Sequence, residues 1–301
     1  MCFGAMWFGT RNDTASSFRL LDQYVDSGGT FVDTANIYAY APQMDPNFQG
    51  GESEQVLRGW FAAGGKREEM FIASKVGFGY VDQAFGLRAA QIEAECDKSL
   101  RRMGIDTIDL YYAHVDDRST PLEETLLAFD RLVQKGKVRY LGASNLLAWR
   151  LEAARGVSQA HGWARYCCIQ QRFSYLRPKP GASFAPQIAA NDDLLDYCTN
   201  EGITLLAYSP LLNGAYTRED RSFPQQYQGL DSDARLVTLR QVAEEAGATA
   251  NQVVLAWMMQ SDPVVIPVIG ATTPEQLTDI LGAFAVHLSD EQMSRLNAAS
   301  A

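Results

Sequence analysis

Eight short apolar runs, separated by stretches with helical spacing, are the feature that most limits how this chain can fold. The runs are residues 2–9, 30–35, 70–76, 107–114, 138–144, 166–171, 203–209 and 263–270. Short, nearly continuous apolar runs are typical of strands that are buried on both faces. Because strands and helices alternate along the chain, we expect a parallel sheet whose strands are connected by helices.

The helical stretches complete this pattern. Helical spacing is found in residues 15–26, 52–63, 91–103, 122–134, 192–200, 234–246 and 274–284. Glycine-containing stops, "SGG", "AGG" and "KG", follow the first, second and fourth of these stretches and mark helix ends before the next strand. Eight strands alternating with helices fit an α/β fold, a closed (β/α)8 TIM barrel, which takes about 250 residues plus insertions.

No Pro/Ser-rich linker or change in composition divides the chain, so we expect residues 1–301 to form a single barrel domain. A doubly wound sheet is the alternative fold. It normally carries a glycine fingerprint after a strand, and the nearest candidate, "GFGYVD" from Gly77, lacks the third glycine and follows the third strand.

Charge and composition narrow the classes of partner. A formal net charge of −10 and a pI near 4.8 argue against a surface built to bind nucleic acid or an anionic membrane. No apolar run approaches the roughly 18 residues of a membrane span, and the first ten residues lack the features of a signal peptide. The five cysteines show neither CxxC spacing nor an even count, so we expect no disulfide framework and no zinc site. We expect a cytoplasmic protein with a small-molecule partner.

Ionisable residues stand at the ends of three consecutive strand-like runs. Asp33 lies near the end of the second run, Lys75 near the end of the third and His114 at the end of the fourth, while Tyr38 follows shortly after the second. Each residue alone has an ordinary explanation, as a cap, a surface charge or a core histidine. In a parallel barrel, however, the carboxyl ends of all strands open on one face, where active sites are built. We therefore expect these four side chains to converge.

The four residues and their surroundings resemble the aldo-keto reductase family. "DTANIY", "ASKVG" and "IDLYYAH" match the catalytic tetrad in the family's order, as Asp33, Tyr38, Lys75 and His114. Further similarity lies in "SLRRMGIDTIDLYYAH", "GKVRYLGASN", "AYSPLLNG" and "PVIGATTPEQL", so the resemblance covers almost the whole chain. It implies the barrel already expected, and a reaction that transfers hydride between a nicotinamide cofactor and a carbonyl or an alcohol.

By this resemblance, Tyr38 is the proton donor to the carbonyl oxygen, and His114 orients that oxygen. A lysine ammonium about 4 Å from the phenol, at an effective dielectric near 20, contributes roughly 4 kcal/mol, or about three pKa units. Lys75 is therefore expected to lower the pKa of Tyr38 toward the working pH. Asp33 is expected to keep Lys75 charged and in place.

The resemblance also implies which residues bind the cofactor. Ser144, Asn145 and Gln170 match positions that hold the nicotinamide carboxamide, and Tyr208 matches the residue that stacks on its ring, with Ser209, Leu211 and Gly214 nearby. Gly270, Ala271 and Thr272 stand at a predicted helix start, where free N–H groups favour phosphate, and Gln276 lies one turn on. The polar residues could equally be strand-end caps, and Tyr208 a core residue.

Two features depart from the family pattern. Many relatives carry Arg or Lys close to positions 272 and 273 to pair with the 2′-phosphate of NADPH, but both residues are threonine here, and Ile280 stands where an adenine-binding Asn is common. A hydroxyl binds phosphate without neutralising it. On family grounds we still expect NADP(H) rather than NAD(H). The family's N-terminal hairpin is also expected to be missing, because Met1 directly precedes the first strand.

Three insertions at the expected mouth of the barrel are long enough to bind substrate: residues 39–51, 174–190 and 211–230. Their aromatic residues either form a platform for a sugar or another ring-shaped molecule, or pack the loops themselves. These residues are Tyr40, Phe48, Tyr175, Phe184, Tyr216, Phe223 and Tyr227. Arg177 and Lys179 are either solvated or directed toward substrate.

Two other functions are alternatives to a reductase. One is a nicotinamide-cofactor-binding regulatory module that acts through a protein partner, resembling the potassium-channel beta subunits; multiple-turnover reduction of a simple aldehyde would argue against it. The other is a metal-dependent barrel hydrolase. With three histidines in the chain, two of them on helix-like or surface segments, we expect no metal site.

Overall fold

The computed structural model describes residues 1–40, 46–81 and 83–300. Eight strands follow one another in chain order, each hydrogen-bonded to the next, and close into a barrel. The pairs from β1 to β6 and the pair β7–β8 are parallel. The strands are β1 Cys2–Gly4, β2 Phe31–Asp33, β3 Phe71–Val76, β4 Ile108–Ala113, β5 Val138–Ser144, β6 Tyr166–Arg172, β7 Thr204–Tyr208 and β8 Val265–Ile269. The prediction of a (β/α)8 barrel is confirmed.

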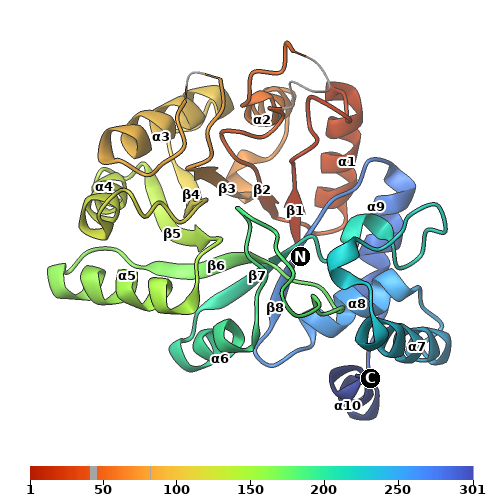
Figure 1. Ribbon diagram of the computed structural model, residues 1–301. Coiled ribbons are helices and arrows are strands. Elements are labelled where there is room, and N and C mark those ends of the chain that lie inside the picture. The colour runs from red at the N-terminus through yellow and green to blue at the C-terminus, as the bar shows by residue number, and fades with distance from the viewer. Residues whose placement is uncertain (41–45, 82, 301) are drawn as a thin grey trace. The chain divides into compact units, whose positions relative to one another are not determined.

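Helices separate the strands along the chain (Figure 1). They are α1 Thr14–Asp26, α2 Glu52–Ala62, α3 Ala89–Met103, α4 Leu122–Gln134, α5 Ala148–His161, α6 Asp192–Glu201, α7 Leu230–Glu245, α8 Ala250–Met259, α9 Pro274–Leu281 and α10 Asp290–Ala298. The seven helical stretches expected from the sequence correspond to α1–α4, α6, α7 and α9. The α9 helix ends at Leu281, earlier than expected, because the chain continues as a 3-10 turn, Gly282–Ala285.

By its internal contacts the chain divides into two compact units, Cys2–Gln170 and Gln171–Ala301, with Met1 grouped with the second. We call them the N-terminal unit and the C-terminal unit and describe each by itself. The single domain expected over residues 1–301 remains a prediction.

In the N-terminal unit, strand register brings polar residues to the same ends of neighbouring strands. Lys75 on β3 is paired with Tyr112 on β4, and Ser144 on β5 with Gln170 on β6. The β3 and β4 strands are buried almost throughout, as continuous apolar runs predict. The first strand is shorter than the expected run of residues 2–9, because the chain turns after Gly4 and the N–H of Phe8 donates to the carbonyl of Ala5.

In the C-terminal unit, β7 and β8 pair through Leu205 and Val265. Helix α8 begins with a capping box, in which Thr249 and Gln252 bond each other's backbone, and its apolar side chains are buried on most faces. No helix in the described part of the chain is both long enough and apolar enough to cross a membrane.

Candidate active site

The side chain of Lys75 is the centre of a buried polar cluster in the N-terminal unit. Its ammonium is fully buried and pairs with the carboxylate of Asp33, which is itself 1% exposed. The same nitrogen lies 2.9 Å from the hydroxyl of Tyr38 and donates to the carbonyl of Thr34 at 2.8 Å. One cation therefore connects the end of β2 with the loop that carries Tyr38.

Strand position and hydrogen bonds fix the side chains of Asp33 and Tyr38. Asp33 is the last residue of β2, and its Oδ2 accepts a hydrogen bond of 2.8 Å from the side-chain amide of Gln170 on β6. Tyr38 lies in a turn that begins after β2, where its N–H donates to the carbonyl of Ala35. Both carboxylate oxygens of Asp33 are thus engaged, so its orientation toward Lys75 is held from two sides.

The electrostatics keep the lysine charged. Burial by itself lowers the pKa of Lys75, but the Asp33 carboxylate and the Tyr38 phenol raise it, and the net pKa lies above the usual value. A buried ammonium normally loses its proton unless it is paired. The expectation that Asp33 maintains the charge of Lys75 is in accord with this geometry.

The pKa of Tyr38 differs from expectation. Burial raises the pKa of Tyr38 to about 12, although Lys75 lowers it as the sequence argument supposed. The expected net lowering toward the working pH is therefore wrong for this structure, because desolvation of the phenolate outweighs the attraction of the ammonium. The phenol is a weaker acid than expected, but its hydroxyl lies within hydrogen-bond distance of the Lys75 ammonium.

His114 follows β4 directly, and its backbone N–H donates to the carbonyl of Val76 on β3. The imidazole lies edge-to-face with the rings of Tyr38 and Phe78, at centroid distances of 6.1 and 4.6 Å. Burial, and next the charge of Lys75, hold the pKa of His114 well below its usual value. Its Nδ1 is buried and has no hydrogen-bond partner among the described residues. A neutral imidazole with an unpaired nitrogen is suited to bind an oxygen of a small molecule.

The residues expected to hold the carboxamide are brought together. Ser144 and Gln170 are register partners, and the side-chain amide of Asn145 donates to Ser144 Oγ at 3.1 Å and to the carbonyl of His114 at 3.0 Å. Asn145 has φ +59°, a conformation that costs energy for a residue other than glycine and that is common at functional sites. These amide and hydroxyl groups match the donors and acceptors of a carboxamide.

In the C-terminal unit, the end of β7 and the loop after it carry four of the expected cofactor residues. Tyr208 ends the strand and is partly exposed, and Ser209 follows with φ +55°. Gly214 has φ +83°, and its N–H donates to the carbonyl of Leu211 at 2.8 Å. The chain therefore turns sharply beyond β7.

The segment after β8 and the first turn of α9 carry the remaining four. The N–H and the hydroxyl of Thr272 both donate to Oε1 of Gln276, at 2.9 and 3.0 Å. Ala271 is buried, and no atom lies within 4 Å of the position that a Cβ on Gly270 would take. Two donors that converge on one oxygen beside open space at a helix start fit a phosphate oxygen.

Several residues of the polar cluster were not expected. Besides the Thr34 carbonyl, Tyr112 lies beside the ammonium, with Lys75 Nζ 5.8 Å from its ring centroid. Asn36 donates from its side chain to the buried carboxylate of Glu95 on α3. Asn36 lies within the quoted "DTANIY" and could have been noticed, whereas Glu95 has no sequence signal, because an acidic residue on a helix normally faces solvent.

The three insertions differ in how they are used. Residues 41–45 of the first lie outside the described residues. In the second, Tyr175 and Phe184 line a cavity of the C-terminal unit, as does Tyr227 of the third. Tyr216 and Phe223 contact each other, with ring centroids 5.4 Å apart. Over residues 1–40, 46–81 and 83–300, no three His, Cys, Asp or Glu side chains are grouped so that they could hold a metal ion.

Comparison with known proteins agrees with this geometry. The model of the Aldo/keto reductase family matches residues 1–301. The chain is 30% identical to the norsolorinic acid reductase stcV of Emericella nidulans, over 97% of this chain and 74% of that protein. It is also 30% identical to the uncharacterised oxidoreductase YrpG of Bacillus subtilis, over 99% of this chain and 90% of that protein.

Among solved structures, a thermostable aldo-keto reductase crystallised with the inhibitor epalrestat superposes with a TM-score of 0.77. That structure is 28% identical, and the match covers 99% of this chain and 94% of the other. The barrel, the whole-chain family match and these relatives agree, so the chain is an oxidoreductase and belongs to the aldo/keto reductase family.

Proposed function

We propose that this protein reduces the carbonyl of an aldehyde, a ketone or a keto-sugar to an alcohol, with Tyr38 as the proton donor. The observation that carries the proposal is the contact of the buried Lys75 ammonium with both the Asp33 carboxylate and the Tyr38 hydroxyl. In this arrangement the hydroxyl of Tyr38 lies beside the positive charge of Lys75, which Asp33 holds in place. No catalytic metal is part of the proposal.

Each residue then has one task. His114, neutral because of its depressed pKa, donates a hydrogen bond to the substrate's carbonyl oxygen and orients it. Tyr38 delivers its hydroxyl proton to that oxygen as negative charge develops there. Lys75 stabilises the phenolate that remains, and Asp33 keeps Lys75 charged and directed at Tyr38.

The reaction also requires a nicotinamide cofactor, which when bound supplies the hydride to the carbonyl carbon. The resemblance assigns its carboxamide to Ser144, Asn145 and Gln170, and its ring to Tyr208 with Ser209, Leu211 and Gly214. The convergent donors of Thr272, beside Gly270, Ala271 and Gln276, support a phosphate site.

We propose NADP(H) rather than NAD(H), on the preference of the family. The threonines at positions 272 and 273 provide hydroxyl groups but no charge for a 2′-phosphate. The substrate is proposed to be a small carbonyl compound or alcohol, and the relatives whose names include norsolorinic acid reductase and aryl-alcohol dehydrogenase favour a ring compound.

The cofactor is tested first. Purified protein is titrated separately with NADPH and NADH while the quenching of its tryptophan and tyrosine fluorescence is followed. We expect saturable binding with a lower dissociation constant for NADPH. Binding of neither cofactor would overturn the proposed reaction.

The donor is tested with Tyr38→Phe, which removes the hydroxyl and keeps the ring. Loss of a general acid typically costs about 10²–10⁴-fold in turnover, so we expect a fall in kcat of that size while the NADPH dissociation constant stays unchanged. Tyr140→Phe, which removes a hydroxyl from an exposed ring on β5, is the matched control and should retain full activity. A Tyr38→Phe variant with unchanged kcat would exclude Tyr38 as the donor.

A further inference from the structure

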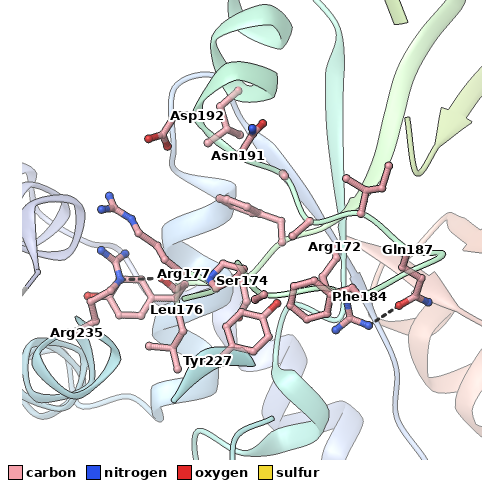
Figure 2. Close-up of a pocket in the computed structure, with 18 of the residues that line it drawn as sticks. Arg172, Ser174, Leu176, Arg177, Phe184, Gln187, Asn191, Asp192, Tyr227 and Arg235 are labelled. Carbon is pink, nitrogen blue, oxygen red and sulfur yellow. Dashed lines mark hydrogen bonds between the residues drawn. The ribbon is translucent and has the colours of Figure 1, made fainter. Parts of the chain in front are cut away.

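The C-terminal unit contains a cavity of about 740 Å³ that the assignment of the active site does not use. Its wall is formed by the last residue of β6, the loop after it, Tyr227 of the segment after β7, and residues of α6, α7, α8 and α10; Figure 2 labels ten of the residues that line it. Cavities of roughly 300–1,000 Å³ are the usual size of small-molecule sites. The cavity is therefore large enough for a drug-sized ligand.

Part of the wall is aromatic. The rings of Phe173 and Trp257 are stacked, with centroids 5.8 Å apart, and the ring of Tyr175 meets Trp257 edge-on at 5.4 Å. Phe184 and Tyr227 form a second pair, with centroids 5.6 Å apart. Aromatic faces of this kind favour a flat apolar ring over a flexible chain.

The wall is also positively charged. Three arginines line the cavity, Arg172, Arg177 and Arg235, against one carboxylate, Asp192. None of these arginines forms an ion pair with a residue in the described part of the chain. With three arginines and one carboxylate the wall carries a net positive charge, which favours an anionic ligand.

Arg235 is the most buried of the three, at 2% exposed. Its Nε donates to the carbonyl of Tyr175 at 2.9 Å and its Nη1 to the carbonyl of Ala299 at 2.7 Å. Burial lowers the pKa of Arg235, and the charge of Arg177 lowers it further, while Tyr175 and Asp231 oppose this. Because backbone carbonyls rather than a carboxylate hold this guanidinium, its charge is not neutralised.

Two polar atoms of residues that line the cavity are buried without a hydrogen-bond partner among the described residues: Nε of Arg172 and the hydroxyl of Tyr175. Arg172 also has polar contacts, with the hydroxyl of Tyr227 and, as Figure 2 shows, with Gln187, where Nη2 donates to Oε1 at 2.7 Å. The same guanidinium lies 4.8 Å from the ring of Phe184 and 5.4 Å from that of Tyr208. Unpaired buried donors are rare in folded proteins and are costly unless a ligand satisfies them.

We propose that this cavity binds a ring-bearing carboxylate, whose ring packs against the wall of Phe173 and Trp257 and whose carboxylate is bound by Arg172. The carboxylate has two possible sources. Because Arg172 packs on Tyr208, which the proposed function assigns to the nicotinamide, the acid group can belong to the substrate; this part rests on the proposed function. Alternatively, it belongs to a second ligand that is not reduced.

The binding test uses benzoate, and benzamide as the uncharged analogue of the same shape, each titrated calorimetrically into the full chain without cofactor. A bidentate hydrogen bond between arginine and a carboxylate is stronger than a hydrogen bond between arginine and a neutral amide. We therefore expect benzoate to bind about tenfold more tightly than benzamide. No binding of benzoate, or equal binding of the two, would overturn the proposal. Because no turnover is measured, this result does not depend on the proposed reaction.

Variants locate the bound carboxylate. Arg172→Gln removes the charge and should reduce benzoate affinity about tenfold while benzamide binding stays unchanged. Lys179→Gln is the control, because it removes a nearby exposed charge that does not line the cavity. Equal losses in the two variants would show that benzoate responds to net charge alone and would contradict the site.

Tyr175→Phe gives an independent readout that does not require Arg172 to be replaced. It removes a buried hydroxyl that has no partner, so the melting temperature without ligand should be unchanged or higher. With benzoate, the increase in melting temperature should be smaller than in the unmodified protein. A lower melting temperature without ligand, combined with an undiminished benzoate effect, would show that the hydroxyl serves the fold and not the ligand.

Steady-state kinetics show whether the bound carboxylate belongs to the substrate or to a second ligand. If the acid group belongs to the substrate, kcat/KM with 4-carboxybenzaldehyde should exceed that with benzaldehyde, Arg172→Gln should abolish the difference, and benzoate should inhibit competitively. If it belongs to a second ligand, the two aldehydes should react alike and benzoate should not compete with them.

Discussion

The side-chain amide of Asn36 donates to the buried carboxylate of Glu95, with 2.7 Å between Nδ2 and Oε2. This bond ties the loop that carries Tyr38 to helix α3. The hydroxyl of Tyr80 donates to the same carboxylate oxygen, and the ammonium of Lys98 to the other one at 2.6 Å. The loop of Tyr38, the proposed proton donor, is therefore held in place by a polar network that does not contact Tyr38 itself.

We predict that Glu95→Gln acts on catalysis through position. The variant keeps the size of the side chain but loses the charge that Lys98 and Tyr80 bond, and a weakened buried network of this kind costs about 1–3 kcal/mol in the free energy of unfolding. A small displacement of a reacting group can lower the rate by up to about 100-fold, so kcat should fall more than KM rises. Urea unfolding and steady-state kinetics measure the two effects.

Glu93→Gln is the matched control on the same helix. Glu93 forms surface ion pairs with Arg131 and Lys135, at 3.5 and 3.3 Å, and such pairs contribute little. It should leave both kcat and stability nearly unchanged. If Glu95→Gln behaved like Glu93→Gln, the network would have no role in positioning Tyr38.

The sequence was sufficient to predict the barrel and the proximity of Asp33, Tyr38, Lys75 and His114, because an ionisable residue near the end of an apolar strand stands out from its surroundings. Asp33, Lys75 and His114 all have this signal. The Glu95 contact has none, since Asn36 and Glu95 are far apart in the chain and meet only after α3 packs. The pKa of Tyr38 was misjudged for a similar reason: the attraction of Lys75 can be reasoned from residue types, but the desolvation that exceeds it depends on burial.

The pH dependence of turnover distinguishes these two views of Tyr38. With a pKa raised to about 12, Tyr38 keeps its proton throughout the neutral and mildly alkaline range. His114, with a pKa well below the usual 6.5, stays uncharged there. We therefore predict that kcat for carbonyl reduction is flat between about pH 7 and pH 9.5. An alkaline inflection within that range that is absent in Tyr38→Phe would indicate the lower pKa expected from Lys75 alone.

Lys75→Met tests the buried ion pair. Removing one partner leaves the Asp33 carboxylate buried without its cation, which should cost about 3–5 kcal/mol in the free energy of unfolding. The double variant Asp33→Asn with Lys75→Met removes both charges and should recover most of that loss. If the double variant were as unstable as the sum of the single variants, the two residues would not be coupled.

The same pair predicts a stability profile with pH. The pKa of Lys75 is raised on folding, so its contribution is complete below the unfolded pKa of about 10.4 and is lost as pH rises through the folded value. The difference in stability between the unmodified protein and Lys75→Met should therefore be constant from about pH 6 to pH 9 and decrease only at higher pH. A decrease that already begins near neutrality would contradict a raised pKa.

Thr272→Arg tests the phosphate end of the cofactor site. Thr272 is exposed at the start of α9 and offers a hydroxyl and an N–H but no charge. Arginine at this position can bind a 2′-phosphate through two bonds, and a hydrogen bond to a charged group contributes roughly 1.5–3 kcal/mol, so NADPH should bind at least about tenfold more tightly while NADH affinity changes little. Thr278→Arg adds the same charge two residues beyond Gln276 on the same helix and should not alter the ratio of the two dissociation constants. If both variants strengthened NADPH binding alike, the gain would come from overall charge rather than from a bond at position 272.

If Thr272→Arg strengthened NADPH and NADH equally, the arginine would be reaching the pyrophosphate that both cofactors share, and the 2′-phosphate would have to be assigned to another part of the chain.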